Sequence, residues 1–335
     1  MVNVALFGAG RIGSLHAANI ADHPRATLSH VYDPDAGIAQ AIAGRHKAKV
    51  ASSVEAVMGD PAIDAVMIAS STSTHVDLIT AAVLAGKAVL CEKPIDLDIA
   101  RVEQCRQAIA GSGVPVQIAF NRRYDRSHRA VRDAVRNGEI GALEQIVITS
   151  RDPGLPSLAY LKTSGGIFRD MTIHDFDLAR FILGDDPVKE LYATGSIMTD
   201  PALGEIGDLD SAMVVMKAAS GALVHINNSR RATYGYDQRV EAFGAKGMVQ
   251  SDNVRASTLM RSDSERTDSR EPLLGFFMER YQQAYRDELN EFIAVVEGTA
   301  VPTADFEDGR CALILADAAW HSLRSDQAIP VKFGR

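Results

Sequence analysis

The sequence has few cysteines, no excess of positive charge and no long apolar segment, and each shortage excludes a class of protein. Its three cysteines, Cys91, Cys105 and Cys311, are odd in number and far apart in sequence. This argues against a disulfide framework and against a cysteine-ligated zinc site, and it favours a reducing, cytoplasmic location. The formal net charge of −8 offers no basic footprint for nucleic acid, so we expect no nucleic-acid partner.

Segments that would insert into a membrane are also missing from the sequence. No apolar run approaches the roughly 18–20 residues that span a bilayer, so we expect no membrane partner. The first residues, MVNVALFGAG, lack the charged lead, apolar stretch and cleavage site of a signal peptide, and we expect none. The 335 residues, 46% of them hydrophobic, exceed what one core usually serves, which predicts two domains.

The sequence does contain a dinucleotide-binding fingerprint at its start. An apolar run over residues 2–7 leads into GAGRIG at 8–13, a helical pattern follows, and a second apolar segment ends at Asp33, about twenty residues later. Gly8 permits the tight turn, Gly10 lets a pyrophosphate approach the backbone, and Gly13 lets the helix pack closely on the strand. The alternative is a glycine-rich turn in some other α/β fold.

Asp33 bears on which dinucleotide is bound. A carboxylate at this position accepts hydrogen bonds from both ribose hydroxyls of NAD and repels the 2′-phosphate of NADP. The next residues, Pro34 and Asp35, provide no arginine that would hold that phosphate. These features favour NAD. Arg11 is able to reach the adenosine side, so NADP stays as the alternative cofactor.

Strands and helices continue to alternate up to about residue 122. Apolar strands are expected at 62–70, 87–94 and 114–125, with a helix after the first of them that Thr74 caps. Repeated βα units predict a doubly wound parallel sheet, whose ligands bind beyond the carboxyl ends of the strands. We expect the residues at the strand ends to converge on one crevice. They are Gly8–Gly13, Asp33, Ser70–His75, Glu92–Pro94 and Asn121–Arg123.

Beyond residue 122 the pattern changes to one helix followed mostly by strands. The expected elements are a helix at 127–141, a strand at 143–152, hairpins at 210–230 and 238–253, an exposed loop or edge strand at 262–271 and a helix at 305–322. Together they predict a mostly antiparallel sheet with one face available for partners or substrate.

The segment SGGIFRDMTIHDFDLARF, residues 164–181, combines charged side chains with an amphipathic helical pattern. Asp170, His174 and Asp177 recur at spacings of four and three, which one helix would place on one face. The residues alone favour a buried, salt-bridged histidine, with a metal site or a proton-transfer pair as alternatives. Lys93 is similarly ambiguous, because a lysine at a strand end is usually solvated.

Four separated motifs together resemble the Gfo/Idh/MocA family of sugar and cyclitol oxidoreductases, and most of all its inositol 2-dehydrogenases. The motifs are the glycine fingerprint, Glu92-Lys93-Pro94, Asn121-Arg122-Arg123-Tyr124-Asp125, and Gly165-Gly166-x3-Asp170-x3-His174-Asp175-x-Asp177. The resemblance extends over essentially the whole chain. The sequence departs from the family at residues 71–75, STSTH, where many members carry a Thr-Pro-x-x-His turn.

The resemblance implies a Rossmann domain at 1–121 and an α+β domain at 122–335. The second domain would carry a large, open, mostly antiparallel sheet that forms the interface of a homotetramer, and the helix at 305–322 would pack back on the first domain. The cofactor would be NAD. Its expected contacts are Gly8, Gly10, Arg11, Ile12, Gly13, Asp33, Ser70, Ser71, Thr72, His75, Glu92, Lys93 and Asn121.

The resemblance also implies oxidation of a cyclitol, most simply of myo-inositol at its axial hydroxyl to the 2-ketone, scyllo-inosose. Lys93, Asp170 and His174 match the family's Lys–Asp–His set, with histidine as the acid–base group and lysine as an alternative proton acceptor. No metal is then needed. The expected polyol contacts are Lys93, Arg122, Asp152, Asp170, His174 and Tyr236, with Tyr234 as an alternative to Tyr236.

Alternatives to each of these assignments remain. In the alternative interpretation, Arg122 or Arg123 only pairs with Asp125, and the tyrosines only pack. The alternative substrates are a pyranose such as glucose, an anhydrosugar and another inositol isomer. A protein of another class, a catalytically silent NAD-binding regulator, would share the fold, but the intact Lys93, Asp170 and His174 argue against it.

Overall fold

The computed structural model describes residues 1–334, and the chain divides into two compact units. Unit 1 comprises Met1–Tyr124 and Gln283–Leu313, and unit 2 comprises Asp125–Gln282 and the chain from Ile314 onward. The sequence analysis places the first boundary after residue 121 and expects the helix at 305–322, but not the chain from residue 283 to 304, to join the first domain.

Unit 1 contains a sheet of six parallel strands in the order β3-β2-β1-β4-β5-β6. The strands are β1 (Val2–Phe7), β2 (Ala26–Tyr32), β3 (Lys49–Val50), β4 (Ala65–Ile68), β5 (Ala88–Glu92) and β6 (Val116–Ala119). This confirms the predicted doubly wound sheet. The strand order reverses between β1 and β4, and this switch point is where such sheets bind their ligands.

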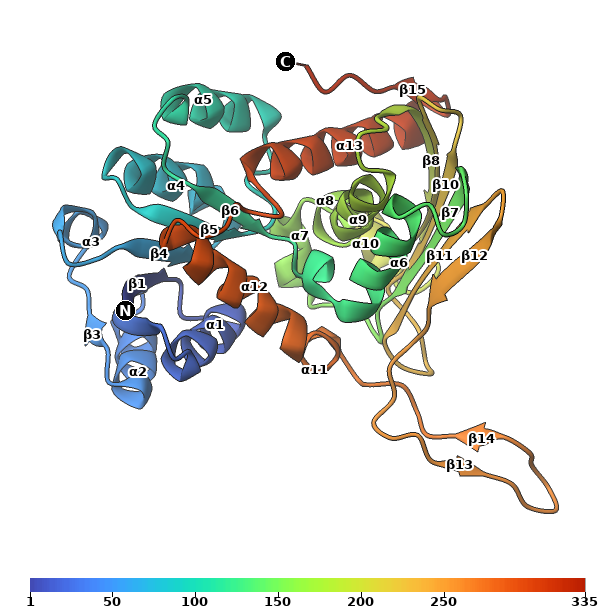
Figure 1. Cartoon of the computed structure of the whole chain (residues 1–335), viewed down its shortest axis with the longest axis horizontal. Coiled ribbons are helices and arrows are strands. Elements are labelled where there is room, and N and C mark those ends of the chain that lie inside the picture. The colour runs from blue at the N-terminus through green and yellow to red at the C-terminus, as the bar shows by residue number, and fades with distance from the viewer. Residues whose placement is uncertain (335) are drawn as a thin grey trace. The chain divides into compact units, whose positions relative to one another are not determined.

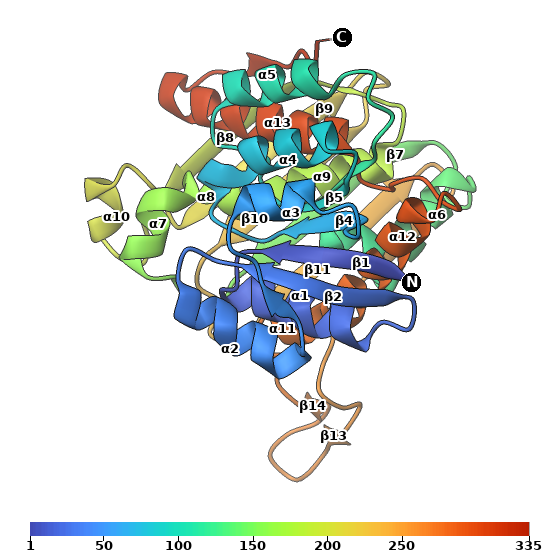
Figure 2. The same ribbon diagram turned by 90° about the vertical axis from the view of Figure 1, so that its left-hand side faces the viewer.

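Helices cover both faces of this sheet, with α1 and α2 on one side of the strands and α4 and α5 on the other (Figure 2). They are α1 (Arg11–Asp22), α2 (Ala36–His46), α3 (Val54–Gly59), α4 (His75–Leu84), α5 (Ile99–Ile109) and α12 (Gln282–Val296), with 3-10 turns η1 (Thr72–Thr74) and η2 (Asn121–Tyr124). The sequence patterns do not predict α12, whose Leu289, Phe292 and Ile293 join the core formed by β1, β2 and α1.

The start of α4 differs from the expected arrangement. Thr74 does not cap the helix, because its hydroxyl donates instead to the carbonyl oxygen of Ser71 at 2.8 Å. The 3-10 turn η1 precedes the helix, and the backbone N–H of Thr74 donates to the same carbonyl oxygen at 2.9 Å. By contrast, α2 does begin with a side-chain cap, because the carboxylate of Asp35 accepts from the backbone N–H groups of Gly37 and Ile38.

Unit 2 contains a seven-stranded sheet in the order β12-β11-β7-β10-β9-β8-β15. The strands are β7 (Leu143–Arg151), β8 (Val188–Ser196), β9 (Ser211–Ala218), β10 (Leu223–Ser229), β11 (Asp237–Gly244), β12 (Gly247–Ser251) and β15 (Ile329–Pro330). The expected hairpins β9–β10 and β11–β12 are present. The sheet is mostly antiparallel, as predicted, but β10 and β7 pair in parallel.

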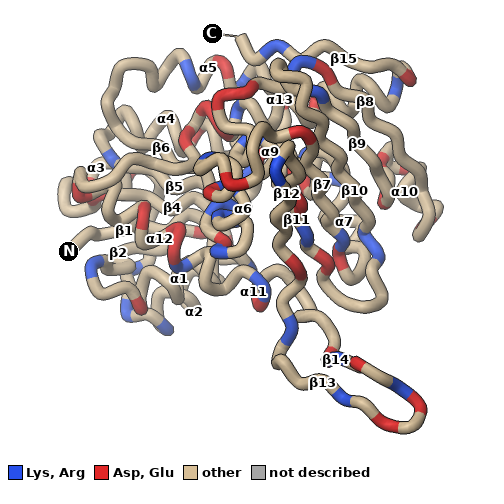
Figure 3. The backbone as a smooth tube through the Cα atoms, turned by 45° about the vertical axis from the view of Figure 1, so that its right-hand side comes forward, with Lys and Arg blue, Asp and Glu red and all other residues tan. Residues whose placement is uncertain are grey.

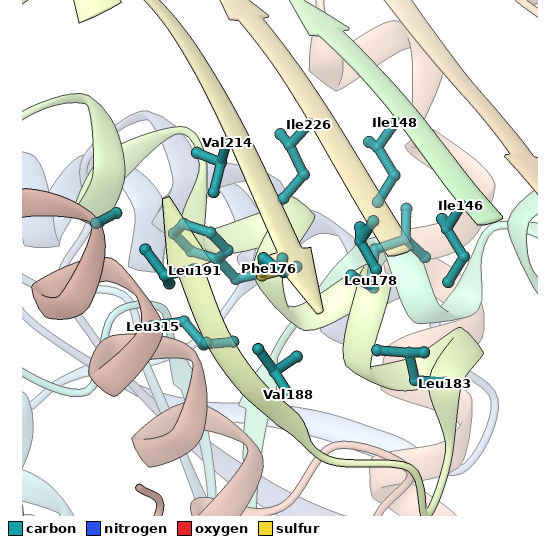
Figure 4. Packing of buried hydrophobic residues seen from close by; sticks show 14 of the residues in the cluster. Ile146, Ile148, Phe176, Leu178, Leu183, Val188, Leu191, Val214, Ile226 and Leu315 are labelled. Atoms are coloured by element: carbon teal, nitrogen blue, oxygen red, sulfur yellow. The ribbon is translucent and has the colours of Figure 1, made fainter. Parts of the chain in front are cut away.

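One face of this sheet packs on helices. In Figure 4, Phe176 and Leu178 of α9 lie among strand residues that include Val214, Ile226 and Ile148. The helices of unit 2 are α6 (Arg126–Arg136), α7 (Leu158–Ser164), α8 (Ile167–Asp170), α9 (Ile173–Leu183), α10 (Ala202–Glu205), α11 (Phe277–Arg280) and α13 (Phe306–Ser325), which begins in unit 1. None of the helices in the described part of the chain has the length and apolar content to cross a membrane.

A short hairpin stands away from the rest of unit 2 (Figure 1). Its strands β13 (Met260–Arg261) and β14 (Ser269–Arg270) pair antiparallel, and the residues between them are exposed. Acidic and basic residues both occur along it (Figure 3). This confirms the exposed character that the polar sequence at 262–271 predicts.

Candidate functional site

The glycine turn between β1 and α1 has the geometry of a phosphate-binding loop. Gly8 has a φ of +91°, and a Cβ there would lie 2.5 Å from the carbonyl oxygen of Ala69. A Cβ on Gly13 would lie 2.0 Å from the carbonyl oxygen of Gly8, whereas a Cβ on Gly10 would meet nothing within 4 Å. The packing of the protein itself therefore requires glycine at positions 8 and 13. Gly10 instead leaves space beside the backbone for a ligand.

The start of α1 and the end of β2 complete this part of the site. Gly10 is the N-cap of α1, and the first N–H groups of a helix have no partners within it, so they are available to a pyrophosphate. The carboxylate of Asp33 accepts from the N–H groups of Ala9 at 2.8 Å and Asp35 at 2.9 Å. These bonds fix the carboxylate beside the turn and leave it lone pairs for ribose hydroxyls. The residues present thus fit NAD, with Arg11 exposed and Ile12 half-buried on the same turn.

His75 lies between the loops that follow β4 and β5. Its imidazole is buried, with Nδ1 2.8 Å from the carbonyl oxygen of Pro94 and Nε2 3.1 Å from that of Ser70. Burial lowers the pKa of His75, although the two carbonyls act in the opposite direction. The imidazole therefore joins the two loops from inside, while Ser71 is exposed and Thr72 half-buried.

The residues that end β5 and follow β6 belong to the same edge of the sheet. The carboxylate of Glu92 lies 2.8 Å from Nε2 of His16, and Lys93, which follows it, is half-buried. The peptide bond between Lys93 and Pro94 is cis. Asn121 is buried in η2. The structure thus places the expected cofactor residues of unit 1 at the carboxyl ends of parallel strands.

The sequence predicts one continuous helix after the glycine pair, up to residue 181, and this prediction is wrong because the segment forms two helices, α8 and α9. Gly165 and Gly166 both have positive φ and separate α7 from α8. A Cβ on Gly166 would lie 2.5 Å from the ring of Trp320 and 2.9 Å from Asp208, so this position needs glycine. The Asp208 carboxylate then accepts from the N–H of Ile167 at 2.8 Å, at the start of α8.

A second interruption separates Asp170 from His174. Between α8 and α9 the N–H of Thr172 donates to the carbonyl of Ile167 at 2.9 Å, one residue further back than in an α-helix. The Thr172 hydroxyl donates to Asn228 at 2.7 Å, which holds the break against the sheet. Asp170 therefore ends one short helix, and His174 lies in the first turn of the next.

Asp170 is held by two side chains that sequence patterns did not identify. Tyr160 donates its hydroxyl to one carboxylate oxygen at 2.7 Å, and the guanidinium of Arg230 donates twice to the other, each at 3.1 Å. Arg230 is only 1% exposed. Burial acts to lower the pKa of Arg230, but the carboxylates of Asp170, Asp152 and Asp208 outweigh it and raise the pKa. Arg230 thus stays charged and holds Asp170 as an oriented carboxylate.

His174 lies beside a second buried polar group. It is half-buried, and the adjacent Asp175 is fully buried and accepts from the side-chain amide of Asn228 at 2.8 Å. Asp177, the third charged residue of the motif, is buried within α9. Among the described residues, no group of three or more His, Cys, Asp or Glu side chains has the arrangement of a metal site.

The remaining candidates for substrate contact lie in both units. Arg122 is buried in η2 of unit 1, and Asp152 is half-buried in unit 2. Tyr236 is buried, with its ring edge-on to Phe276 and Tyr281. Two other residues have fixed partners. Asp125, the alternative partner of Arg122, forms an ion pair with Arg280, and the Tyr234 hydroxyl donates to Asp237 at 2.6 Å.

Comparison with known sequences extends these observations to the whole chain. Residues 2–120 match the profile described as "Oxidoreductase family, NAD-binding Rossmann fold", and residues 128–250 match that of the GFO/IDH/MocA C-terminal domain. An inositol 2-dehydrogenase of Rhizobium meliloti is 46% identical, with 98% of this chain and 99% of the relative aligned. A myo-inositol 2-dehydrogenase of Thermotoga maritima is 41% identical, with 99% of both chains aligned.

Solved structures show the same likeness in three dimensions. A myo-inositol dehydrogenase from Corynebacterium glutamicum superposes with a TM-score of 0.95 at 44% identity, covering 99% of both chains. A scyllo-inositol dehydrogenase from Lactobacillus casei, solved with NAD(H) and scyllo-inositol bound, superposes with a TM-score of 0.91 at 28% identity. That likeness covers 98% of this chain and 99% of the other.

Proposed function

Because the chain belongs to the Gfo/Idh/MocA family of NAD-dependent oxidoreductases, we propose that it is an inositol 2-dehydrogenase that oxidises myo-inositol at its axial hydroxyl to scyllo-inosose. The observation that carries the proposal is the full-length likeness to inositol 2-dehydrogenases at 41–46% identity. The NAD-binding turn at Gly8–Gly13 and the fixed carboxylate of Asp33 agree with it.

The proposed chemistry divides one alcohol oxidation between cofactor and protein. NAD, when bound, takes the hydride from the carbon that carries the hydroxyl. The protein must then accept the hydroxyl proton, and we assign this role to His174, whose imidazole has a suitable intrinsic pKa. Lys93 would donate a hydrogen bond to the reacting oxygen and stabilise the negative charge that develops there. Lys93 as the proton acceptor is the alternative within the same set.

Asp170 suits an orienting role better than a proton-accepting one. Arg230 and Tyr160 already donate to both of its oxygens, and bonds of this kind favour the charged form of a carboxylate. An oriented carboxylate can accept a hydrogen bond from the substrate or from the imidazole and stabilise the imidazolium that forms. We therefore propose that Asp170 keeps its charge throughout the reaction and that His174 carries the proton.

The substrate contacts follow from the chemistry of a polyol. A cyclitol presents hydroxyl groups all round, and each can donate and accept a hydrogen bond. We propose Arg122 as a donor, Asp152 as an acceptor and the Tyr236 hydroxyl as a group that does both. The acceptor role of Asp152 is supported by its position, because its side chain is half-buried and its charge acts on Arg230.

We also propose that the chain forms a homotetramer through the open face of the unit 2 sheet. Apolar side chains on that face are exposed, among them Met213 at 50%, Val215 at 47% and Phe243 at 40%. They lie on β9 and β11, and their neighbours in sequence point into the core. An exposed apolar sheet face of this kind is a common subunit interface.

The test compares turnover with cofactor binding in the same preparations. Wild-type protein with NAD or NADP would be given myo-, scyllo- and chiro-inositol, glucose, xylose and an anhydrosugar, and formation of reduced cofactor would be followed by absorbance. Turnover of myo-inositol with NAD is expected. Lys93→Met and His174→Ala should lose at least about a hundredfold in kcat and still bind NADH, while His321→Ala, an exposed histidine, should behave as wild type.

Other outcomes would select the alternatives. Turnover of a pyranose in place of the inositols would keep the assigned residues and replace the substrate. Full turnover by the His174→Ala protein would contradict the assignment of the base. If no substrate is turned over while NADH binding is intact, the alternative of a non-catalytic NAD-binding regulator is favoured.

A further inference from the structure

The interior of unit 1 holds a carboxyl group that the proposed chemistry does not use. Glu288 lies on α12, and 0% of it is exposed. Within the described residues, neither of its carboxyl oxygens has a hydrogen-bond partner. Burying an ionised carboxylate without partners is strongly destabilising. Burying a protonated carboxyl at the same position costs far less free energy. The geometry therefore requires Glu288 to keep its proton in the folded protein.

The charges that act on Glu288 are negative. Burial raises the pKa of the Glu288 carboxyl well above its ordinary value, and the charges of Glu92 and Glu291 raise it further. Each of these carboxylates has its own partner. Glu92 lies 2.8 Å from Nε2 of His16 on α1, and Glu291 accepts from the hydroxyl of Tyr124 in η2 at 2.6 Å. Ionisation of Glu288 would add a third negative charge to this cluster.

Glu92 connects the cluster to the cofactor edge of the sheet. It is the last residue of β5 and directly precedes Lys93. Its partner His16 lies on α1, the helix whose N-terminus follows the glycine turn. The backbone at Glu288 is held in place, because the side-chain amide of Gln117 on β6 donates to its carbonyl oxygen at 3.3 Å. A charge on Glu288 would therefore act on Glu92.

We propose that Glu288 is a positioning residue for the cofactor site, a neutral acid behind Glu92 whose ionisation displaces the end of β5 and weakens the binding of NAD(H). This proposal rests on NAD binding, which the family shows, and not on the identity of the substrate or of the proton acceptor. With Glu288 neutral, Glu92 stays paired with His16 at the strand end. With Glu288 charged, repulsion between the two carboxylates separates that pair.

The direction of the pH dependence follows from linkage. The pKa of Glu288 in the folded protein lies above its value in the unfolded chain, so the folded state holds the proton more tightly. The stability that neutral Glu288 contributes is complete below the unfolded-state pKa and declines as the pH rises towards the folded-state pKa. Because the proposal has ionised Glu288 binding NAD(H) less well, cofactor affinity declines in the same direction. Each unit by which binding raises that pKa corresponds to a tenfold change in the dissociation constant.

The test measures NADH affinity by nucleotide fluorescence, and thermal unfolding without cofactor, from about pH 6 to about pH 9.5, a range that includes known pKa values of buried glutamates. The dissociation constant of the wild-type protein should rise by about tenfold over this range. Glu288→Gln, a neutral group of the same shape, should bind as wild type does at pH 6 and show no such rise. Asp287→Asn, which changes the preceding acid on α12, should keep the wild-type profile.

Three further variants test the interpretation. His16→Gln, made with and without Glu288→Gln, shows how much of the profile belongs to the imidazole. Glu288→Leu should unfold at or above the wild-type temperature, since a neutral buried group without partners can be replaced by an apolar one of similar size. A flat wild-type profile would overturn the proposal. So would an unchanged alkaline rise in Glu288→Gln, or loss of folding in both Glu288 variants.

Discussion

Replacing Arg230 with methionine should strongly destabilise unit 2. The guanidinium is 1% exposed and donates twice to Asp170, each time at 3.1 Å. Removing one partner of a buried ion pair leaves the other charge uncompensated and costs about 3–5 kcal/mol. For a unit of this size each kcal/mol lowers the unfolding temperature by about 2–4 °C, so we expect a drop of about 6–20 °C.

The assay is thermal unfolding by circular dichroism on a double-mutant cycle. Arg230→Met, Asp170→Asn and the double variant would be compared with wild type. Because each single change leaves its partner unpaired, the double variant should be more stable than the sum of the single costs predicts, by at least about 1 kcal/mol. Arg231→Met is the matched control, since Arg231 is exposed and should shift stability by no more than about 0.5 kcal/mol.

Two results would refute this reasoning. If the free energy of unfolding of Arg230→Met is within about 1 kcal/mol of the wild-type value, the ion pair does not hold Asp170. If the single costs simply add in the double variant, the two residues act independently. NADH affinity, which we assign to unit 1, should be unchanged by Arg230→Met wherever the variant stays folded.

Three other predictions concern the cofactor turn and the sheet face. Gly13→Ala should abolish NADH binding and lower the unfolding temperature. Gly10→Ala should unfold at the wild-type temperature and lose only affinity for NADH. Equal effects of the two changes on stability would contradict the packing argument. Asp33→Asn should lower the preference for NAD over NADP by about tenfold in kcat/KM, and an unchanged ratio would remove Asp33 from the choice. Val215→Glu should reduce the proposed tetramer to smaller species in light scattering, while an unchanged mass would place the interface elsewhere.

The cofactor turn was predictable because its signals are local. The apolar run of β1, the glycines at 8 and 13 and the acid at Asp33 lie within one βαβ unit. Two of the reasons for glycine are also local, namely the φ of +91° at Gly8 and the contact of Gly13 with the carbonyl oxygen of Gly8. The hairpin β9–β10 is equally local, since its strands are joined by a turn at Ser220-Gly221. In both cases the residues that determine the structure are close in sequence.

The surroundings of Asp170 were not predictable in this way. Arg230 lies sixty residues further along the chain from Asp170 and follows a strand, where nothing local distinguishes it from a solvated arginine. The helix break at Thr172 likewise depends on Asn228, on a different element. Helical periodicity suggested one continuous face because it contains no information about such distant partners.

The parallel pairing of β7 with β10 and the position of α12 have the same cause. A hairpin pattern identifies neighbours along the chain, but β7 and β10 pair across a long excursion that includes α9 and β8. The helix α12 joins the unit 1 core through Phe292 although it follows unit 2 in sequence. Long-range burial, and not local propensity, decides both.

The most direct test of the central claim follows the hydrogen that the reaction moves. Wild-type protein would be incubated with NAD and with myo-inositol carrying deuterium at C2, the carbon of the axial hydroxyl, and the reduced cofactor would be analysed by mass spectrometry. The proposed function predicts that the deuterium appears on the nicotinamide ring and that scyllo-inosose accumulates in equal amount. Reduced cofactor without deuterium would show oxidation at another carbon, and absence of reduction would contradict the assignment of this chain as an inositol 2-dehydrogenase.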